Sequence, residues 1–224
     1  LIDTQHHIKG KGGNVLEVKD KKVQKTPIIR IIDSLMGSGK TCYMINQIND
    51  NPEDNYICVV KFICEVNRII TQCPKVEFYT PSNDRYDSKE RDFHEILQNK
   101  RSMVITHELF RRLTFSNKEL TILREEEYHL IFDEVPEVVE PLKVSTYDRK
   151  ELLERYVTVE TNDLVRWSVQ DYKGDHDEIK RQIMSKEVIY RGSCFLWRMS
   201  IDKITAFKRI DVLTFMFDGS HMKN

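Results

Sequence analysis

The segment from Ser34 to Thr41 contains residues whose types and spacing could bind the phosphates of a nucleotide. It reads Ser-Leu-Met-Gly-Ser-Gly-Lys-Thr and joins an apolar run to a helical pattern that begins at Thr41. In a loop of this kind the backbone N–H groups and the positive end of the helix dipole face an anion, and Gly37 and Gly39 allow a close approach. Lys40 would contact the β and γ phosphates, and the Thr41 hydroxyl would bind Mg²⁺.

The usual phosphate-loop pattern, G-x-x-x-x-G-K-[ST], differs from this segment at one position. Ser34 stands where the pattern has glycine, at the entry of the loop and outside the part that would face the anion. Because a strand-like run precedes the loop and a helical pattern follows it, we predict a site for ATP and Mg²⁺. Its predicted nucleotide-binding residues are Met36, Gly37, Ser38, Gly39, Lys40 and Thr41.

Two carboxylates, Asp133 and Glu134, follow the apolar run at 129–132. In a parallel sheet this strand end and the phosphate loop lie at the same carboxyl edge, so Asp133 could approach the metal ion that Thr41 holds. Side chains alternate along a strand, so Glu134 points elsewhere and could orient or deprotonate a water molecule. Such a pair belongs to ATP hydrolysis, and the predicted catalytic residues are Lys40, Asp133 and Glu134.

Short apolar blocks alternate with helical patterns from residue 27 onward. Continuous apolar runs suit strands that are buried on both faces of a parallel sheet, and parallel neighbours need helical crossovers. We therefore predict an α/β fold, a mainly parallel sheet with helices on both faces, in which strands 28–33 and 130–133 are both central. The predicted strands are 28–33, 57–60, 76–79, 103–105 and 130–132, and the predicted helices are 41–48, 65–71, 91–99 and 108–113.

The flanking regions are less regular. The polar start of the chain has one strand-like piece at 14–18, and the alternation fades beyond Pro141. The region 141–190 is either an insertion packed on the sheet edge or a mobile loop. Further candidates are a helix at 150–155 and strands at 194–200 and 209–217. The predicted division is a lead-in segment at 1–26, a main domain at 27–217 and the start of a continuation at 218–224.

The composition excludes several classes of protein. Lys and Arg number 35 against 36 Asp and Glu, so the net charge of −1 gives no general attraction to nucleic acid. With 40% hydrophobic and 32% charged residues the chain is of globular type, and no apolar stretch is long enough to cross a membrane. The five cysteines are odd in number and none are spaced C-x-x-C, which argues against disulfides or a zinc clip. We expect a cytoplasmic protein, in the host cytoplasm if it is viral.

The phosphate loop and the carboxylate pair together resemble the first motor domain of superfamily 2 (DEAD/DEAH-like) helicases of bacteriophage type. Residues 36–41 resemble helicase motif I, and Asp133-Glu134 resembles motif II, followed here by Val135-Pro136 in place of Ala-Asp or Ala-His. The resemblance covers residues 27–217 and implies a RecA-like phosphate-loop fold. It implies an ATP-dependent nucleic-acid motor that hydrolyses ATP with Mg²⁺.

Three weaker matches extend this resemblance. Lys61-Phe62 occupies the place of motif Ia, residues 106–110 are similar to a Thr-His-x-Leu-Phe segment, and Thr214 falls on the strand that bears motif III. The roles implied are nucleic-acid contacts by Lys61, Arg68, Thr106 and His107, and coupling by Thr214. Helix capping explains Thr106 equally well, and an exposed helix face explains Arg68.

A superfamily 2 helicase has a second motor domain that supplies arginines to the nucleotide cleft. No second series of strands like that of a phosphate-loop domain follows residue 217. The resemblance therefore implies half of a motor, with weak nucleotide binding and little unwinding by itself. The expected partners are single-stranded nucleic acid, taken to be DNA, and replication proteins, with no membrane.

Three alternatives remain. A nucleoside kinase of the thymidine kinase type shares both motifs, but such enzymes usually add a cysteine zinc lasso, for which the cysteine spacing here is wrong. The ATPase of a DNA-packaging motor or a helicase loader shares both motifs but lacks the segment at 106–110. A non-hydrolysing binding module is disfavoured by the intact Lys40, Thr41 and carboxylate pair.

Overall fold

The computed structural model of the chain describes residues 26–215 and contains a six-stranded sheet in the order β1-β11-β5-β2-β4-β3. Every pair of neighbouring strands in this sheet is parallel, so the predicted α/β fold with a parallel sheet is confirmed. Its strands are β1 (Ile28–Asp33), β2 (Tyr56–Val60), β3 (Phe78–Tyr79), β4 (Ser102–Thr106), β5 (His129–Phe132) and β11 (Arg209–Thr214).

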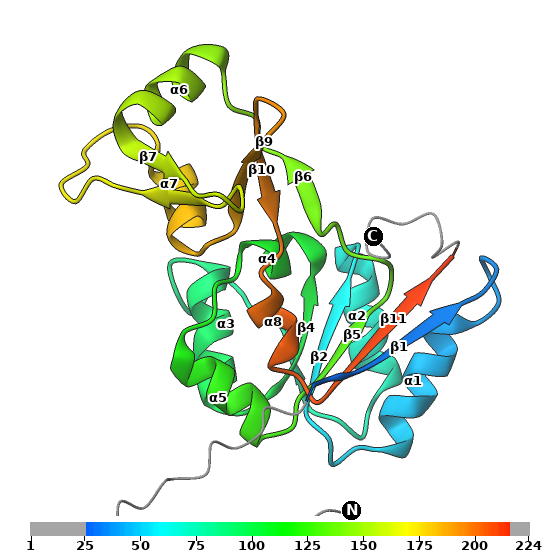
Figure 1. Ribbon diagram of the computed structural model, residues 1–224. Helices are drawn as coiled ribbons and strands as arrows, with labels where there is room; N and C mark the ends of the chain where they lie inside the picture. Colours follow the sequence, from blue (N-terminus) through cyan, green and yellow to red (C-terminus); the bar gives the residue numbers. More distant parts are fainter. Residues whose placement is uncertain (1–25, 216–224) are drawn as a thin grey trace, which may run out of the picture.

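Helices cover both faces of the sheet (Figure 1). The first face carries α1 (Lys40–Asp50) and α2 (Ile63–Gln72). The helices on the second face are α3 (Lys89–Gln98), α4 (His107–Arg112), α5 (Asn117–Glu125) and α8 (Ile201–Thr205). The four predicted helices are α1 to α4, each within a few residues of its predicted bounds, whereas α5 and α8 were not predicted.

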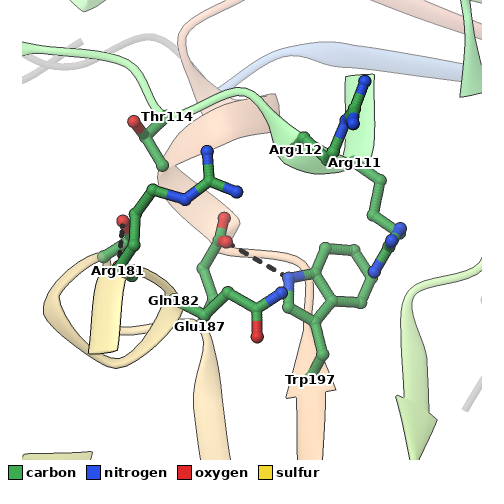
Figure 2. Close-up of a pocket in the computed structure, with 8 residues that line it drawn as sticks. Arg111, Arg112, Thr114, Arg181, Gln182, Glu187 and Trp197 are labelled. Atoms are coloured by element: carbon green, nitrogen blue, oxygen red, sulfur yellow. Dashed lines mark hydrogen bonds between the residues drawn. The ribbon is translucent and has the colours of Figure 1, made fainter. Parts of the chain in front are cut away.

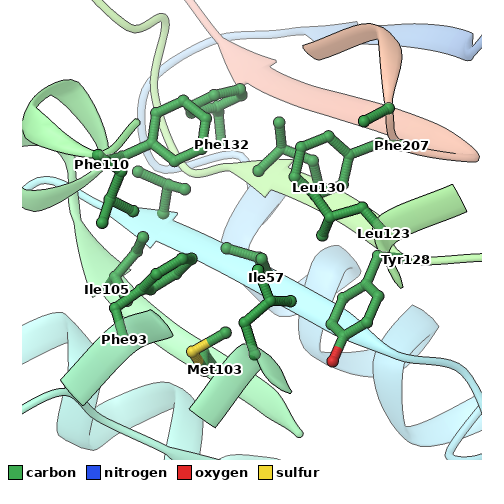
Figure 3. Close-up of a cluster of buried hydrophobic side chains, with 14 of the residues drawn as sticks. Ile57, Phe93, Met103, Ile105, Phe110, Leu123, Tyr128, Leu130, Phe132 and Phe207 are labelled. Carbon is green, nitrogen blue, oxygen red and sulfur yellow. The ribbon is translucent and has the colours of Figure 1, made fainter. Parts of the chain in front are cut away.

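The central strands are buried because their side chains alternate between two apolar clusters. In β2, Ile57 and Val59 pack toward α3, α4 and α5, while Cys58 and Val60 pack toward α1 and α2. Figure 3 shows the larger cluster, in which Phe132 of β5 lies against the helical side chain Phe110. All four residues of β5 are buried, as the prediction of a central strand required.

The prediction that β1 is also central is wrong. Among the described residues β1 pairs only with β11 and forms one edge of the sheet. Ile28 is 63% exposed, and Ile29 and Ile31 are also exposed. A run of β-branched residues favours a strand whether one or both of its edges are paired, so the run could not distinguish these two positions.

Residues 139–198 form a small lobe with its own core. Its elements are β6 (Val139–Pro141), α6 (Thr146–Glu151), a π-helical turn (Leu152–Tyr156), β7 (Val157–Val159), β8 (Val165–Trp167), α7 (Asp177–Met184), β9 (Val188–Arg191) and β10 (Cys194–Arg198). The core includes Val165, Ile183 and Phe195. The predicted strand at 194–200 is thus β10, which pairs antiparallel with β6 and β9 and does not join the main sheet.

The lobe leaves the main sheet after β5 and returns through α8 to β11 (Figure 1). At this junction Lys203 of α8 and Glu187 of the lobe form an ion pair at 2.5 Å, with side chains only 4% and 3% exposed. Figure 2 shows Glu187 hydrogen-bonded to the Trp197 indole, with Arg111 of α4 on the other side of the ring. The lobe and the main body are therefore joined by a buried polar contact.

The remaining predictions have mixed outcomes. The strand predicted at 76–79 is reduced to the two-residue edge strand β3, and the helix predicted at 150–155 corresponds to the end of α6 and the π-helical turn. The strand predicted at 14–18 and the segment 218–224 lie outside the described residues. None of the helices within 26–215 is both long and apolar enough to cross a membrane.

Candidate nucleotide-binding site

Except for Arg68, which lies in α2, the site residues predicted from the sequence lie at the carboxyl ends of five adjacent strands. Along this edge the strands follow the order β1, β11, β5, β2, β4. The phosphate loop to Thr41 follows β1, Thr214 ends β11, and Asp133 and Glu134 follow β5. Lys61 follows β2, and Thr106 and His107 lie at the end of β4. The predicted nucleotide-binding residues are thus at one end of the row and most of the predicted nucleic-acid contacts are at the other.

Gly37 and Gly39 give the phosphate loop its shape. Both have left-handed backbone conformations, with φ of 76° and 88°, which residues with a side chain rarely adopt. A Cβ built at either glycine would meet no atom within 4 Å, so an open space lies beside the loop. Gly39 is also the N-cap residue of α1, so the backbone leads directly from this space into the helix. The residues present therefore fit an anion at a helix N-terminus.

Lys40 is held by its own loop. Its Nζ donates hydrogen bonds to the carbonyl oxygens of Ser34, at 2.7 Å, and Leu35, at 2.9 Å. The hydroxyls of Ser34 and Ser38 are 2.7 Å apart and form a hydrogen bond across the loop. Ser34, the departure from the usual pattern, therefore contributes a cross-link that glycine could not make. The ammonium group of Lys40 is thereby positioned at the loop, where it could exchange carbonyl oxygens for phosphate oxygens.

Thr41 and Asp133 are in direct contact. The Thr41 hydroxyl donates to the Asp133 carboxylate, with distances of 3.1 and 3.3 Å to its two oxygens. Burial raises the pKa of Asp133 to about 6, and the hydrogen bond from Thr41 opposes that rise. A hydroxyl and a half-buried carboxylate form a hard oxygen donor set, which suits Mg²⁺. The spatial pairing predicted from the two motifs is therefore present.

Glu134 has a different partner from Asp133 and forms an ion pair with Lys61. Its Oε2 lies 3.0 Å from Lys61 Nζ, and the two side chains are 51% and 53% exposed. Lys61 also lies beside the Phe62 ring, with 5.7 Å between Nζ and the ring centroid. The sequence predicted a role for Glu134 and a role for Lys61, but it did not predict the ion pair between them.

Thr214 adjoins the phosphate loop through the backbone. Its carbonyl oxygen accepts a hydrogen bond from the Ser34 N–H at 3.1 Å, and its side chain is buried. In β11, Asp211 also accepts a bidentate hydrogen bond from Arg30 of β1, with two distances of 2.7 Å. The strand predicted to carry the coupling residue is therefore fixed to the strand that leads into the loop.

The other predicted nucleic-acid contacts have local partners. Thr106 caps α4, since its hydroxyl accepts a hydrogen bond from the Leu109 N–H at 3.3 Å. Burial lowers the pKa of His107, which favours the neutral form of its imidazole. Arg68 lies beside Cys42 of α1, with 3.7 Å between Nη2 and Sγ. The helix cap that the sequence offered as one explanation of Thr106 is thus present. Contacts of Thr106, His107 and Arg68 with nucleic acid remain predictions.

Large apolar side chains are exposed along the same edge. Leu35 and Met36 project from the phosphate loop, and Phe62 and Ile63 begin α2 beside Lys61. Between half and four-fifths of each side chain is exposed to solvent. Phe62 thus presents an aromatic face next to a positive charge, a combination that can hold a nucleic-acid strand.

The fold and the site define a parallel α/β protein whose carboxyl edge carries a glycine-rich loop and a carboxylate pair, which is consistent with a phosphate-loop fold. No family model matches the chain. The chain is a homologue of the SPbeta prophage-derived uncharacterized protein YonV of Bacillus subtilis (strain 168), with 31% identity over 208 residues. The matched region is 87% of this chain and 50% of the relative, so the chain spans about half the length of this relative.

Proposed function

We propose that this chain is the ATP-binding half of an ATP-dependent nucleic-acid motor, of the helicase or translocase type. The observation that supports the proposal best is the contact of Thr41 with Asp133 beside a loop whose Gly37 and Gly39 leave an open space. The prophage-derived origin of the relative is consistent with the proposal of a motor that acts in bacteriophage replication.

In this function the loop N–H groups and Lys40 hold the phosphates of ATP. Thr41 and Asp133 would hold Mg²⁺, and the ion would supply positive charge that neutralises the phosphates. Glu134 orients the attacking water molecule and accepts its proton while a bond forms from the water oxygen to the γ phosphorus. The bond to the leaving oxygen breaks, and its electron pair leaves with ADP.

The nucleic-acid strand would lie across the carboxyl ends of β2 and β4, where Lys61 and Phe62 are exposed. Backbone phosphates would contact Lys61, and a base would stack on Phe62. Arg68, Thr106 and His107 would be neighbours of this strand. Such binding depends on local groups, so it needs no large net positive charge.

The test measures phosphate release and nucleoside phosphorylation by the full-length protein with ATP alone, with single-stranded oligonucleotide, and with thymidine. The motor predicts stimulation by oligonucleotide that weakens as salt is raised and depends little on base sequence. A nucleoside kinase would ignore the oligonucleotide and convert thymidine to a phosphorylated product. Turnover that requires thymidine would therefore overturn the proposal.

A further inference from the structure

We propose that Lys61 acts as a restraint on Glu134, holding the carboxylate in an ion pair until a nucleic-acid phosphate replaces it as the partner of Lys61. This inference rests on the proposed function, because it concerns how the same site is regulated. Its structural basis is the ion pair of 3.0 Å between Lys61 Nζ and Glu134 Oε2.

The fold brings the two residues to the same level of the sheet. Strands β2 and β5 are direct neighbours, and Val59 is paired with Phe132. Lys61 and Glu134 each come two residues later, just past the carboxyl ends of their strands. The ion pair therefore follows from the register of the two strands. Buried side chains on both faces of the sheet fix this register.

The ion pair interferes with the work proposed for Glu134. A carboxylate that accepts a proton from water must direct an unoccupied oxygen toward that water. Here one oxygen of Glu134 faces the ammonium group of Lys61, which follows β2, whereas Asp133 is the carboxylate that contacts Thr41. While the pair persists, the base is therefore partly neutralised and oriented toward the predicted nucleic-acid contacts.

The pair is also easy to exchange. Both side chains are about half exposed, so solvent and salt screen their attraction, and pairs of this kind contribute little stability. Lys61 sits beside the exposed ring of Phe62, where a strand that stacks on the ring would bring its phosphate close to the ammonium group. A phosphate that binds Lys61 would release Glu134, and ATP hydrolysis would be coupled to the presence of the strand.

The experiment compares the Lys61→Met variant of the full-length protein with the unchanged full-length protein in steady-state ATP hydrolysis. Loss of a weak ion pair should raise kcat without nucleic acid about two- to fivefold and leave KM for ATP unchanged. The additional stimulation by single-stranded DNA should shrink, because the restraint is already absent. Lys61→Arg keeps the charge and should restore the low unstimulated kcat.

Lys208→Met is the matched control. Lys208 pairs with Glu127 at 2.6 Å, with side chains 45% and 61% exposed, and it lies before β11, at the amino end of the sheet. Its loss should leave both rates unchanged. An unstimulated kcat of Lys61→Met at or below that of the unchanged protein would refute the restraint. If the full-length protein that contains this chain shows no turnover, or turnover that Lys40→Ala does not remove, the proposed function itself fails.

Discussion

Asp133 and Glu134 are adjacent in the chain but have different surroundings. Asp133 is half-buried and accepts a hydrogen bond from Thr41, and burial raises its pKa to about 6. Glu134 is about half exposed and faces Lys61. This difference follows from the alternation of side chains at the strand end. It separates a carboxylate suited to holding a metal ion from one that can reach a water molecule.

Glu134→Gln should stop hydrolysis while ATP and Mg²⁺ still bind. The amide keeps the shape of the side chain but cannot accept a proton, so kcat should fall about 10²- to 10⁴-fold. The exposed position predicts a change in unfolding free energy within about 0.5 kcal/mol. Nucleotide binding by calorimetry and phosphate release are the two measurements. Loss of ATP binding would show that Glu134 is structural.

Asp133→Asn should act on the metal ion. Its carboxylate is the partner of Thr41, so its removal should weaken the apparent affinity for Mg²⁺ about ten- to a hundredfold. A magnesium titration of ATP binding measures this change. An unaltered magnesium dependence would mean that Asp133 does not support the metal site.

The residues of the phosphate loop could be predicted because they form one uninterrupted segment of the chain, in which the glycines, the lysine and the threonine each have a known role. The contact between Thr41 and Asp133 could be predicted because both follow parallel strands at the same edge. The ion pair of Lys61 with Glu134 could not, because it depends on the register between two strands. Nothing in the spacing of these residues fixes that register.

Among the elements, α3 and α5 are joined by a buried carboxylate. Glu119 of α5 accepts hydrogen bonds from the Ser116 N–H and hydroxyl, at 2.8 and 2.7 Å, and lies 2.6 Å from His94 Nδ1 of α3. Burial would raise the pKa of Glu119, but the hydrogen bonds from His94 and Ser116 outweigh it and hold the pKa at about 2. Ionised Glu119 therefore favours the folded state.

Glu119→Gln should remove a pH-dependent part of the stability. Because the folded pKa is depressed, the contribution is complete above about pH 4.5 and is lost as pH falls toward about 2. It amounts to about 3 kcal/mol at pH 7, and roughly half should remain at pH 3.5. Urea unfolding at both pH values measures it, with Glu125→Gln, on the exposed side of α5, as the control. Equal pH dependence in all three proteins would contradict the assignment.

The elements were predicted best where the pattern was local. β5 was identified as a strand by its continuous apolar residues, and α1 by the helical spacing after the phosphate loop. The edge position of β1 depends on its neighbours, which the run of isoleucines does not reveal. α5 was missed, although Ser116 and Glu119 form a capping box that marks its start. An insertion at 141–190 was one of two predicted alternatives, but most of its strands were not predicted, because the strands of the lobe are only three to five residues long.

At the scale of the whole molecule, a buried polar junction is among the contacts that hold the small lobe to the main body. Lys203 donates to the Arg111 carbonyl at 3.0 Å as well as pairing with Glu187. Burial lowers the pKa of Lys203, and the charge of Glu187 opposes this change. A cavity of about 10 Å³, room for one water molecule, adjoins Trp197 there (Figure 2).

Lys203→Met should destabilise the protein by about 3–5 kcal/mol, because it leaves the Glu187 carboxylate buried without its ionic partner. Adding Glu187→Gln removes that charge, so the double variant should be more stable than the sum of the two single effects predicts. Chemical unfolding of the four proteins measures the coupling. Strict additivity would show that the two groups do not interact in solution.

The whole molecule presents its chemistry at one edge. The phosphate loop, the carboxylate pair and the exposed Lys61 and Phe62 all lie at the carboxyl ends of parallel strands. The pairing of the strands and the helices packed on both faces fix those ends relative to one another. A nucleotide at one end of the row and a nucleic-acid strand at the other would thus be connected through Glu134.

The most direct test of a nucleotide site at this edge is calorimetric titration of ATP with Mg²⁺ into the protein and into Lys40→Ala. We predict saturable binding that needs Mg²⁺ and weakens by about 3 kcal/mol, roughly two orders of magnitude in Kd, when the Lys40 charge is removed. Far-UV circular dichroism of the variant should be unchanged. Equal ATP affinity of the two proteins would contradict the central claim, because the phosphates would then bind elsewhere.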